Sequence, residues 1–272
     1  MEILSPQNSR VKEWAGLLEK KNRDKQYKYL IEGIHLVKEA LLARADIECV
    51  CYEVEGGIPS ELHEAASAGI DVEWVGVSSA VISKCSDTKT PQPVFAVVRK
   101  DHGMVQPLLD KERSLVVVLD GVQDPGNVGT IIRSADAVGA DGVIVGAGCA
   151  DIYGPKVIRA TMGSLFHLPV VNGKLGEVLP QAKARGIRLA GTSLQAAANC
   201  FAYDFTGPVW LLFGSEGGGL SSEVRELMDD GLIIPMRGKA ESLNVAMAAS
   251  VLLYEAMRQR HFSNINNSRC QL

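Results

Sequence analysis

The stretch at residues 232–257, LIIPMRGKAESLNVAMAASVLLYEAM, is the part of the chain around which the rest is organised. It opens with an apolar run at 232–235, crosses a polar loop, and ends in a run at 245–253 that is apolar on almost every side. A helix without a polar face is usually buried on all sides. Ser242 and Asn244 can cap it, because their side chains accept hydrogen bonds from free backbone N–H groups. The stretch predicts a strand, a polar loop and a buried helix. Taken alone, this is an ordinary strand–loop–helix unit. It becomes a candidate ligand site if other polar loops lie beside it.

The composition indicates a globular intracellular protein. The chain has 272 residues, enough for one large domain or two ordinary ones, with 46% hydrophobic and 22% charged residues. No apolar run reaches the ~20 residues of a membrane span, and the N-terminus MEILSPQNSR lacks the pattern of a signal peptide. We therefore expect no membrane partner. None of the six cysteines forms a Cys-x-x-Cys pair, so we expect free thiols and no metal site, in a cytoplasmic protein. Cys49 and Cys51 are expected to share one buried face of a strand.

The net charge of −4 argues against a protein that coats nucleic acid generically, but it allows a local basic patch. Residues 8–28 carry seven basic and three acidic side chains, and Val11, Trp14 and Leu18 recur there at helical spacing. Asn8 or Ser9 is the candidate cap for that helix. The basic face either contacts phosphates or is simply solvated.

Alternating strands and helices predict an α/β fold. Residues 1–99 read as a small α/β domain, 100–113 as a linker, 114–260 as a larger domain and 261–272 as a flexible tail. The larger domain is expected to be a mostly parallel sheet covered by helices on both faces, with ligands at the carboxyl ends of its strands. Its expected strands are 115–119, 142–145, 167–171, 189–192 and 209–213, and a last strand and helix come from residues 232–257. A helix is expected after 189–192 and another after 209–213.

Two further loops are too polar or too rich in glycine to be simple connections. In 120–140, an Asp-Pro-Gly turn precedes Asn127, and Arg133 lies on an otherwise apolar helix, where it either extends to water or reaches an anion. In 213–220, FGSEGGGL, the glycines let backbone approach a ligand closely. The loop matches neither the G-x-G-x-x-G dinucleotide pattern nor a phosphate loop, and Glu216 disfavours phosphate there.

Together the three loops resemble the signature motifs of the SpoU (TrmH-type) RNA ribose 2′-O-methyltransferases of the SPOUT superfamily. The N-terminal domain resembles an L30e-like substrate-binding domain, through the residues NSRVK at 8–12 and the pair at 32–33. The matching positions of the three loops are Asn127…Arg133, Gly214-Ser215-Glu216-Gly217…Leu220 and Ile234-Pro235-Met236…Ser242-Leu243-Asn244-Val245.

The resemblance implies a C-terminal trefoil knot, which base rates alone would argue against. It also implies a homodimer with its site near the interface, and S-adenosylmethionine as the methyl donor. The donor would be held by backbone or side chains of Thr192, Gly214, Glu216, Gly217, Ile234, Met236 and Leu243.

The implied reaction is methyl transfer to a ribose 2′-hydroxyl. Arg133 is expected to orient the hydroxyl and stabilise developing negative charge, since a guanidinium with a pKa above ~12 is an awkward base. Glu216 is expected to brace the loops or Arg133. Asn127, Ser242 and Asn244 are expected to position the nucleotide, to cap helices, or to do both. The exposed basic residues expected to contact RNA are Arg10, Lys12, Lys20, Lys21 and Arg23.

Three other functions are compatible with parts of the sequence. A non-catalytic RNA-binding or ribosome-assembly factor would not need the donor loops, and a nucleotide-dependent oxidoreductase would need the missing glycine fingerprint. Within the resembling family, transfer RNA is the alternative substrate. The two-domain layout favours 23S ribosomal RNA by analogy.

Overall fold

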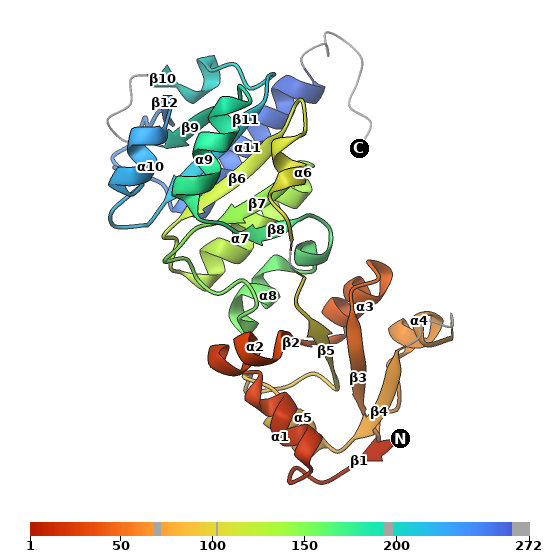
Figure 1. Cartoon of the computed structure of the whole chain (residues 1–272). Helices are drawn as coiled ribbons and strands as arrows, with labels where there is room; N and C mark the ends of the chain where they lie inside the picture. The colour runs from red at the N-terminus through yellow and green to blue at the C-terminus, as the bar shows by residue number, and fades with distance from the viewer. Residues whose placement is uncertain (68–71, 102, 193–197, 263–272) are drawn as a thin grey trace. The chain divides into compact units, whose positions relative to one another are not determined.

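The computed structural model describes residues 1–67, 72–101, 103–192 and 198–262 (Figure 1). The chain divides into two compact units. Unit 1 combines Met1–His102 with Asp151–His167, and unit 2 combines Gly103–Ala150 with Leu168–Leu272. The segment Asp151–His167 thus groups with the N-terminal residues, although it interrupts the larger domain in sequence. Within the described ranges, no helix is long and apolar enough to cross a membrane.

Unit 1 is built on a five-stranded mixed sheet with the strand order β1-β4-β3-β5-β2. β3 pairs in parallel with β4, whereas β5 runs antiparallel to both β3 and β2. The strands are β1 (Glu2–Ile3), β2 (Lys28–Glu32), β3 (Ile47–Glu53), β4 (Glu73–Val77) and β5 (Val94–Arg99). The helices are α1 (Ser9–Gly16), α2 (Lys20–Gln26), α3 (Ile34–Leu42), η1 (Ser60–Leu62), α4 (His63–Ser67), α5 (Ser79–Lys84), α8 (Pro155–Thr161) and η2 (Ser164–Phe166).

One hydrophobic core cluster of unit 1 lies between the sheet and helices α1 and α5. Trp14 on α1 meets the ring of Phe95 on β5 edge-on, with ring centroids 5.8 Å apart. Cys49 and Cys51 are fully buried free thiols in this same core, so the prediction that they share one buried strand face is confirmed. Asn8 caps α1, as expected, by accepting a hydrogen bond from the backbone N–H of Arg10 at 2.9 Å.

Arg23 anchors the segment Asp151–His167 inside unit 1. Its side chain is only 4% exposed, donates to the carbonyl oxygens of Leu17 and Leu18, and pairs with Asp151 at 2.6 Å. The prediction that Arg23 belongs to an exposed basic surface is therefore wrong, because its donors are used inside the protein.

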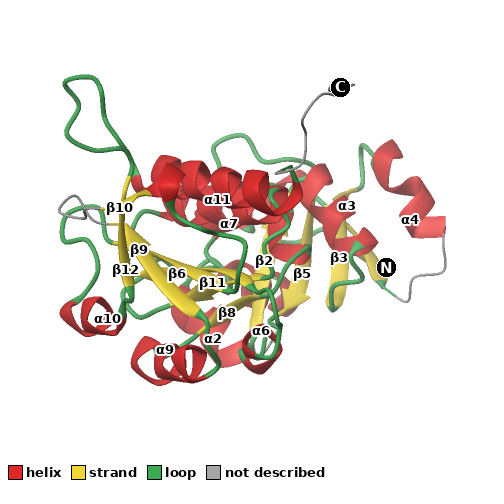
Figure 2. Cartoon of the chain, turned by 90° about the horizontal axis from the view of Figure 1, so that it is seen from above, coloured by secondary structure: helices red, strands yellow, loops and turns green. Residues whose placement is uncertain are grey.

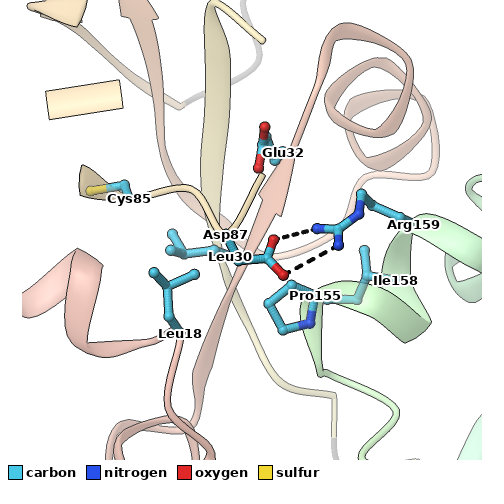
Figure 3. A pocket seen from close by; sticks show the side chains of 8 residues that line it. All are labelled: Leu18, Leu30, Glu32, Cys85, Asp87, Pro155, Ile158 and Arg159. Atoms are coloured by element: carbon cyan, nitrogen blue, oxygen red, sulfur yellow. Dashed lines mark hydrogen bonds and ion pairs between the residues drawn. The ribbon is translucent and has the colours of Figure 1, made fainter. Parts of the chain in front are cut away.

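A second ion pair joins α8 to the loop after α5. Figure 3 shows the Arg159 guanidinium facing the Asp87 carboxylate, with Pro155 and Ile158 beside them. The hollow that these side chains line has a volume of about 10 Å³, enough for roughly one water molecule and no larger ligand.

Unit 2 is built on a seven-stranded sheet with the order β10-β12-β9-β11-β6-β7-β8. Every strand pair in it is parallel, which confirms the parallel sheet predicted from sequence. The strands are β6 (Leu115–Asp120), β7 (Gly142–Val145), β8 (Val170–Asn172), β9 (Arg188–Thr192), β10 (Ala198–Asn199), β11 (Val209–Gly214) and β12 (Asp230–Ile233). The helices are α6 (Gln106–Leu109), α7 (Pro125–Ala137), α9 (Leu175–Ala184), η3 (Cys200–Ala202), α10 (Ser222–Leu227) and α11 (Val245–His261).

Helices cover both faces of this sheet, as predicted. Figure 2 shows α7 and α11 on one face and α6, α9 and α10 on the other. Two expectations need correction. The described residues after β9 form strand β10 and a short 3₁₀ turn instead of a full helix, because Asn199 caps only the single turn before Tyr203. The predicted tail begins inside α11, which ends at His261; positions 263–272 lie outside the described residues.

α11 is not buried on all sides, contrary to the prediction from its apolar sequence. Its inner face buries Ala249, Leu252 and Leu253, but Met247 is 49% exposed and Tyr254 is 50% exposed. These two residues are seven positions apart and therefore lie on the same side of the helix. Met247 and Tyr254 therefore form an apolar stripe on α11 that is exposed to solvent in the single chain.

Candidate functional site

The carboxyl ends of four adjacent strands place the motif loops at one edge of the unit 2 sheet. Asp120, the last residue of β6, is in register with Gly214, the last residue of β11. On the other side of β11, Thr192 at the end of β9 is in register with Leu232 of β12. The loops that leave these strands therefore begin at the same level, which is where a parallel sheet binds ligands.

A cavity of about 620 Å³ opens at this edge. Its lining includes the seven residues predicted to hold a cofactor, together with Ser242 and Asn244. Asn127 and Arg133 are not part of the lining. Those seven residues are Thr192, Gly214, Glu216, Gly217, Ile234, Met236 and Leu243.

The glycine-rich loop after β11 folds into a tight turn that forms one wall of the cavity. Ser215 and Gly219 exchange backbone hydrogen bonds of 3.0 Å in both directions, and the Ser215 hydroxyl accepts from the Gly218 N–H at 3.1 Å. A Cβ atom at Gly214 would lie 2.0 Å from the carbonyl carbon of Gly219. Only glycine fits there, whereas Gly217 faces open space.

Asn127 joins the three motif loops through its side-chain amide. Its Nδ2 donates to Oε1 of Glu216 at 2.8 Å, and its Oδ1 accepts from Nδ2 of Asn244 at 3.0 Å. Asn244 also caps α11, since its Oδ1 accepts from the backbone N–H of Ala246 at 2.9 Å. Asn244 therefore combines the expected capping role with a bond between loops that the sequence did not predict, and its contact with a nucleotide stays a prediction.

Glu216 is held as a carboxylate. Partial burial tends to raise its pKa. The hydrogen bond from Asn127, with further ones from its own N–H and those of Gln123 and Asp124, outweighs that tendency, so the pKa lies below the usual glutamate value. Among the described residues Glu216 bonds to Asn127 and not to Arg133. Its observed position therefore suits bracing the loop after β6.

Arg133 lies apart from the cavity of its own chain. It is exposed on α7, nearly two turns beyond Asn127, and it makes no hydrogen bond or ion pair with any described residue. Its backbone neighbours Ile131 and Ile132 are fully buried, so the exposed guanidinium extends away from the sheet. An unpaired arginine in this position is available to a second molecule.

The predicted RNA-contacting residues of unit 1 differ in whether their charges are paired within the protein. Lys12, Lys20 and Lys21 are exposed and make no ion pair with a described residue. Arg10 is bound in two places instead: both of its terminal nitrogens contact Glu73, at 3.0 and 2.6 Å, and it stacks over Trp14. Of the five predicted residues, only the three lysines therefore keep an exposed charge that no described residue pairs with.

Sequence reasoning missed Arg225, which also lines the cavity. Its Nη2 donates to the carbonyl oxygen of Leu220 at 2.9 Å. The sequence feature that could have identified Arg225 is its position five residues after the glycine-rich loop, on the helix that follows that loop. Among the described residues, no group of histidine, cysteine or acidic side chains is arranged to hold a metal ion.

Comparison with known proteins fits this geometry. Residues 114–254 match the model of the SpoU rRNA Methylase family, and residues 8–96 match an MRM3-like substrate binding domain. The chain is 39% identical to the 23S rRNA (guanosine(2553)-2'-O)-methyltransferase RlmP of Bacillus subtilis, over 93% of this chain and 98% of that protein. It is 35% identical to a 23S rRNA (uridine(2479)-2'-O)-methyltransferase of Streptomyces viridochromogenes, over 94% and 92%.

The structure is also similar to solved ones. The crystal structure of the SpoU methyltransferase AviRb from Streptomyces viridochromogenes, in complex with the cofactor AdoMet, superposes with a TM-score of 0.86. That match has 35% sequence identity and covers 93% of this chain and 98% of the other. The sequence match over both units and the shared fold lead to one conclusion: the chain belongs to the SpoU rRNA methylase family.

Proposed function

We propose that this protein transfers the methyl group of S-adenosylmethionine to a ribose 2′-hydroxyl of 23S ribosomal RNA. The observation that carries the proposal is the joining of three motif loops by Asn127 beside a cavity of about 620 Å³. Relatives that align with both units are named for methylation of 23S rRNA, which favours that substrate over transfer RNA.

The cavity fits S-adenosylmethionine in size and in chemistry. Small-molecule sites commonly have volumes of ~300–1,000 Å³ and combine apolar walls with a few polar groups. Here Ile234, Met236 and Leu243 provide apolar surface, and the open backbone of Gly217 offers hydrogen-bonding groups without a side chain in the way. We infer that backbone at Gly214, Ile234 and Leu243 holds the adenosine part, with Thr192, Glu216 and Gly217 lining the same space.

The bound donor supplies an already activated methyl group, so the protein has to align the acceptor and assist the loss of one proton. Arg133 contributes by orienting the 2′-hydroxyl and stabilising the negative charge that develops on its oxygen. Asn127 and Asn244 keep the loops in register, and Ser242 offers a hydroxyl at the cavity wall.

A homodimer accounts for the position of Arg133. The exposed stripe of Met247 and Tyr254 on α11 gives two copies an apolar surface to bury, and α7, which carries Arg133, packs beside α11 through the Ser134–Ser250 hydrogen bond of 2.8 Å. Arg133 of one protomer then serves the donor cavity of its partner. We propose this dimeric assembly, and a cytoplasmic location, for the protein.

The loops after β11 and β12 also form part of the trefoil knot that we propose for unit 2. Support comes from family membership and from the convergence of these loops on one cavity. Pulling the chain from both ends tests it. A knotted chain stops short of the ~3.3–3.6 Å per residue that a fully extended chain spans, whereas an unknotted chain reaches it.

Methylation is tested with labelled S-adenosylmethionine and an unmodified transcript of 23S rRNA, followed by mapping of the 2′-O-methyl group. We expect calorimetric binding of the donor and incorporation at one nucleotide. Arg133→Ala should retain donor binding and lose most transfer. Efficient transfer to transfer RNA alone would replace the substrate, and absence of donor binding would rule out the reaction.

A further inference from the structure

Two cations in the loop after β12 lie directly beside the donor cavity and have no role in the proposed reaction. Arg237 and Lys239 stand between Met236 and Ser242, both of which line the cavity. Both cations are exposed, and neither makes a hydrogen bond or ion pair with a residue in the described part of the chain. Glu241 is the one acid of the stretch 236–241, which leaves the loop with a net positive charge.

Arg225 adds a third cation from another element. It lines the cavity from α10, and its bond to the Leu220 carbonyl fixes the guanidinium at that wall. A guanidinium has five N–H donors, so most of them remain available to an anion. Arg225, Arg237 and Lys239 are called the rim cations below.

Several other cations of unit 2 differ, because acidic partners neutralise them. Lys183 pairs with Asp229 at 2.8 Å, and Arg188 pairs with Asp230 at 2.6 Å. Lys174, the residue that precedes α9, pairs with Glu177 at 3.1 Å. In a chain with a net charge of −4, three cations without an acidic partner among the described residues therefore concentrate positive charge locally at one cavity.

We propose that the rim cations bind the phosphates that flank the target ribose. This inference rests on the proposed function. A 2′-hydroxyl lies within one nucleotide of two phosphates, so a ribose that enters the cavity mouth brings both phosphates to its rim. Exposed cations on a loop can meet them at a small desolvation cost and without reading the base. Unit 2 thus contributes its own RNA contacts, in addition to the lysines of unit 1.

The double variant R237Q/K239Q removes two of these charges and leaves every lining residue of the cavity in place. Its binding to an unmodified 23S rRNA transcript is measured at several salt concentrations. Each lost phosphate contact should reduce the slope of log affinity against log salt by about 0.7–0.9, and affinity near physiological salt should fall on the order of tenfold. KM for RNA should rise by a similar factor, while kcat at saturating RNA and donor binding stay within about twofold.

Two controls accompany it. R237K/K239R keeps both charges and should retain the wild-type slope. Lys174→Gln removes a cation that is already paired with Glu177 and should retain it too. An unchanged slope in R237Q/K239Q, in a wild-type enzyme that methylates the transcript, would overturn the inference and leave the proposed function standing. If the wild-type protein neither binds donor nor methylates RNA, the function fails and the inference fails with it.

Discussion

At the scale of single residues, the site depends on side chains that do two things at once. Asn244 caps a helix and also donates to Asn127, which in turn donates to Glu216. A capping residue and a residue that orders an active site are indistinguishable in sequence, because both need an oxygen or amide at a helix start. They can be separated by a substitution that preserves one role.

Asn244→Ser should separate them. Serine caps helices about as well as asparagine, so the free energy of unfolding should stay within a few tenths of a kcal/mol, whereas Asn244→Ala should lose about 1 kcal/mol. Both variants lack the amide donor to Asn127, so both should lose on the order of tenfold in kcat/KM. Chemical denaturation and transfer kinetics measure the two effects, and wild-type kcat/KM in Asn244→Ser would show that the cap alone matters.

At the scale of elements, the glycine-rich loop is shaped by backbone packing against the end of β11. Gly214 is buried against Gly219 and Leu220, whereas a Cβ atom added at Gly217 would have no other atom within 4 Å. The two glycines look equivalent in sequence, yet only one is required by steric contact.

Gly214→Ala should therefore disrupt the loop, and Gly217→Ala should be tolerated. The added Cβ at Gly214 forces the turn away from β11, which we expect to cost ~1–3 kcal/mol of stability and to abolish measurable donor binding. Calorimetric titration with S-adenosylmethionine compares the two variants. Equal donor binding by both would contradict the steric argument.

The segment Asp151–His167 is a second element, and the sequence does not predict its environment. Arg23→Met leaves the Asp151 carboxylate, which is 17% exposed, without its cationic partner and with only the Tyr153 N–H bonded to it, and should cost ~3 kcal/mol. Arg10→Met is the matched control, because its pair with Glu73 is partly exposed and should contribute no more than ~1 kcal/mol. Equilibrium unfolding in urea measures both losses, and similar values for the two variants would refute the structural role given to Arg23.

At the scale of the whole molecule, we propose that the site is complete only in a dimer. Arg133 is absent from the lining of its own cavity, and the Met247–Tyr254 stripe offers a surface for a second copy. Burial of such a stripe is a common driving force for association. The catalytic arginine and the donor cavity would then come from different chains.

Heterodimers of Arg133→Ala and Leu243→Arg test this arrangement. The first lacks the arginine and the second has a blocked cavity, so each homodimer should be inactive. If Arg133 acts across the interface, one of the two sites in the heterodimer is intact, and kcat should return to about half of the wild-type value. Heterodimers purified through two different tags give the measurement; no recovery would place Arg133 in its own subunit's site.

Much of unit 2 could be predicted because its strands are continuous apolar runs separated by loops with specific chemistry. Leu115–Asp120 and Val209–Gly214 are buried on both faces, and strands of this kind can be predicted from their apolar sequences alone. The burial of Arg23 and the exposure of Met247 were not predictable in this way. Both depend on which distant residues pack against them, and a charge or an apolar side chain does not specify that by itself.

The sequence alone determined the parallel α/β sheet and the three motif loops, because strand periodicity and turn chemistry are local properties. The candidate donor residues came from the resemblance of those loops to a known family. Only the tertiary structure decided that Asn127 joins Glu216 to Asn244, that Arg23 is buried against Asp151, and that Arg133 lies away from its own cavity. The first two are contacts between residues that lie 89 to 128 positions apart in the sequence, and the third is the absence of Arg133 from the cavity lining. Their outcome depends on how the elements pack, which no local pattern encodes.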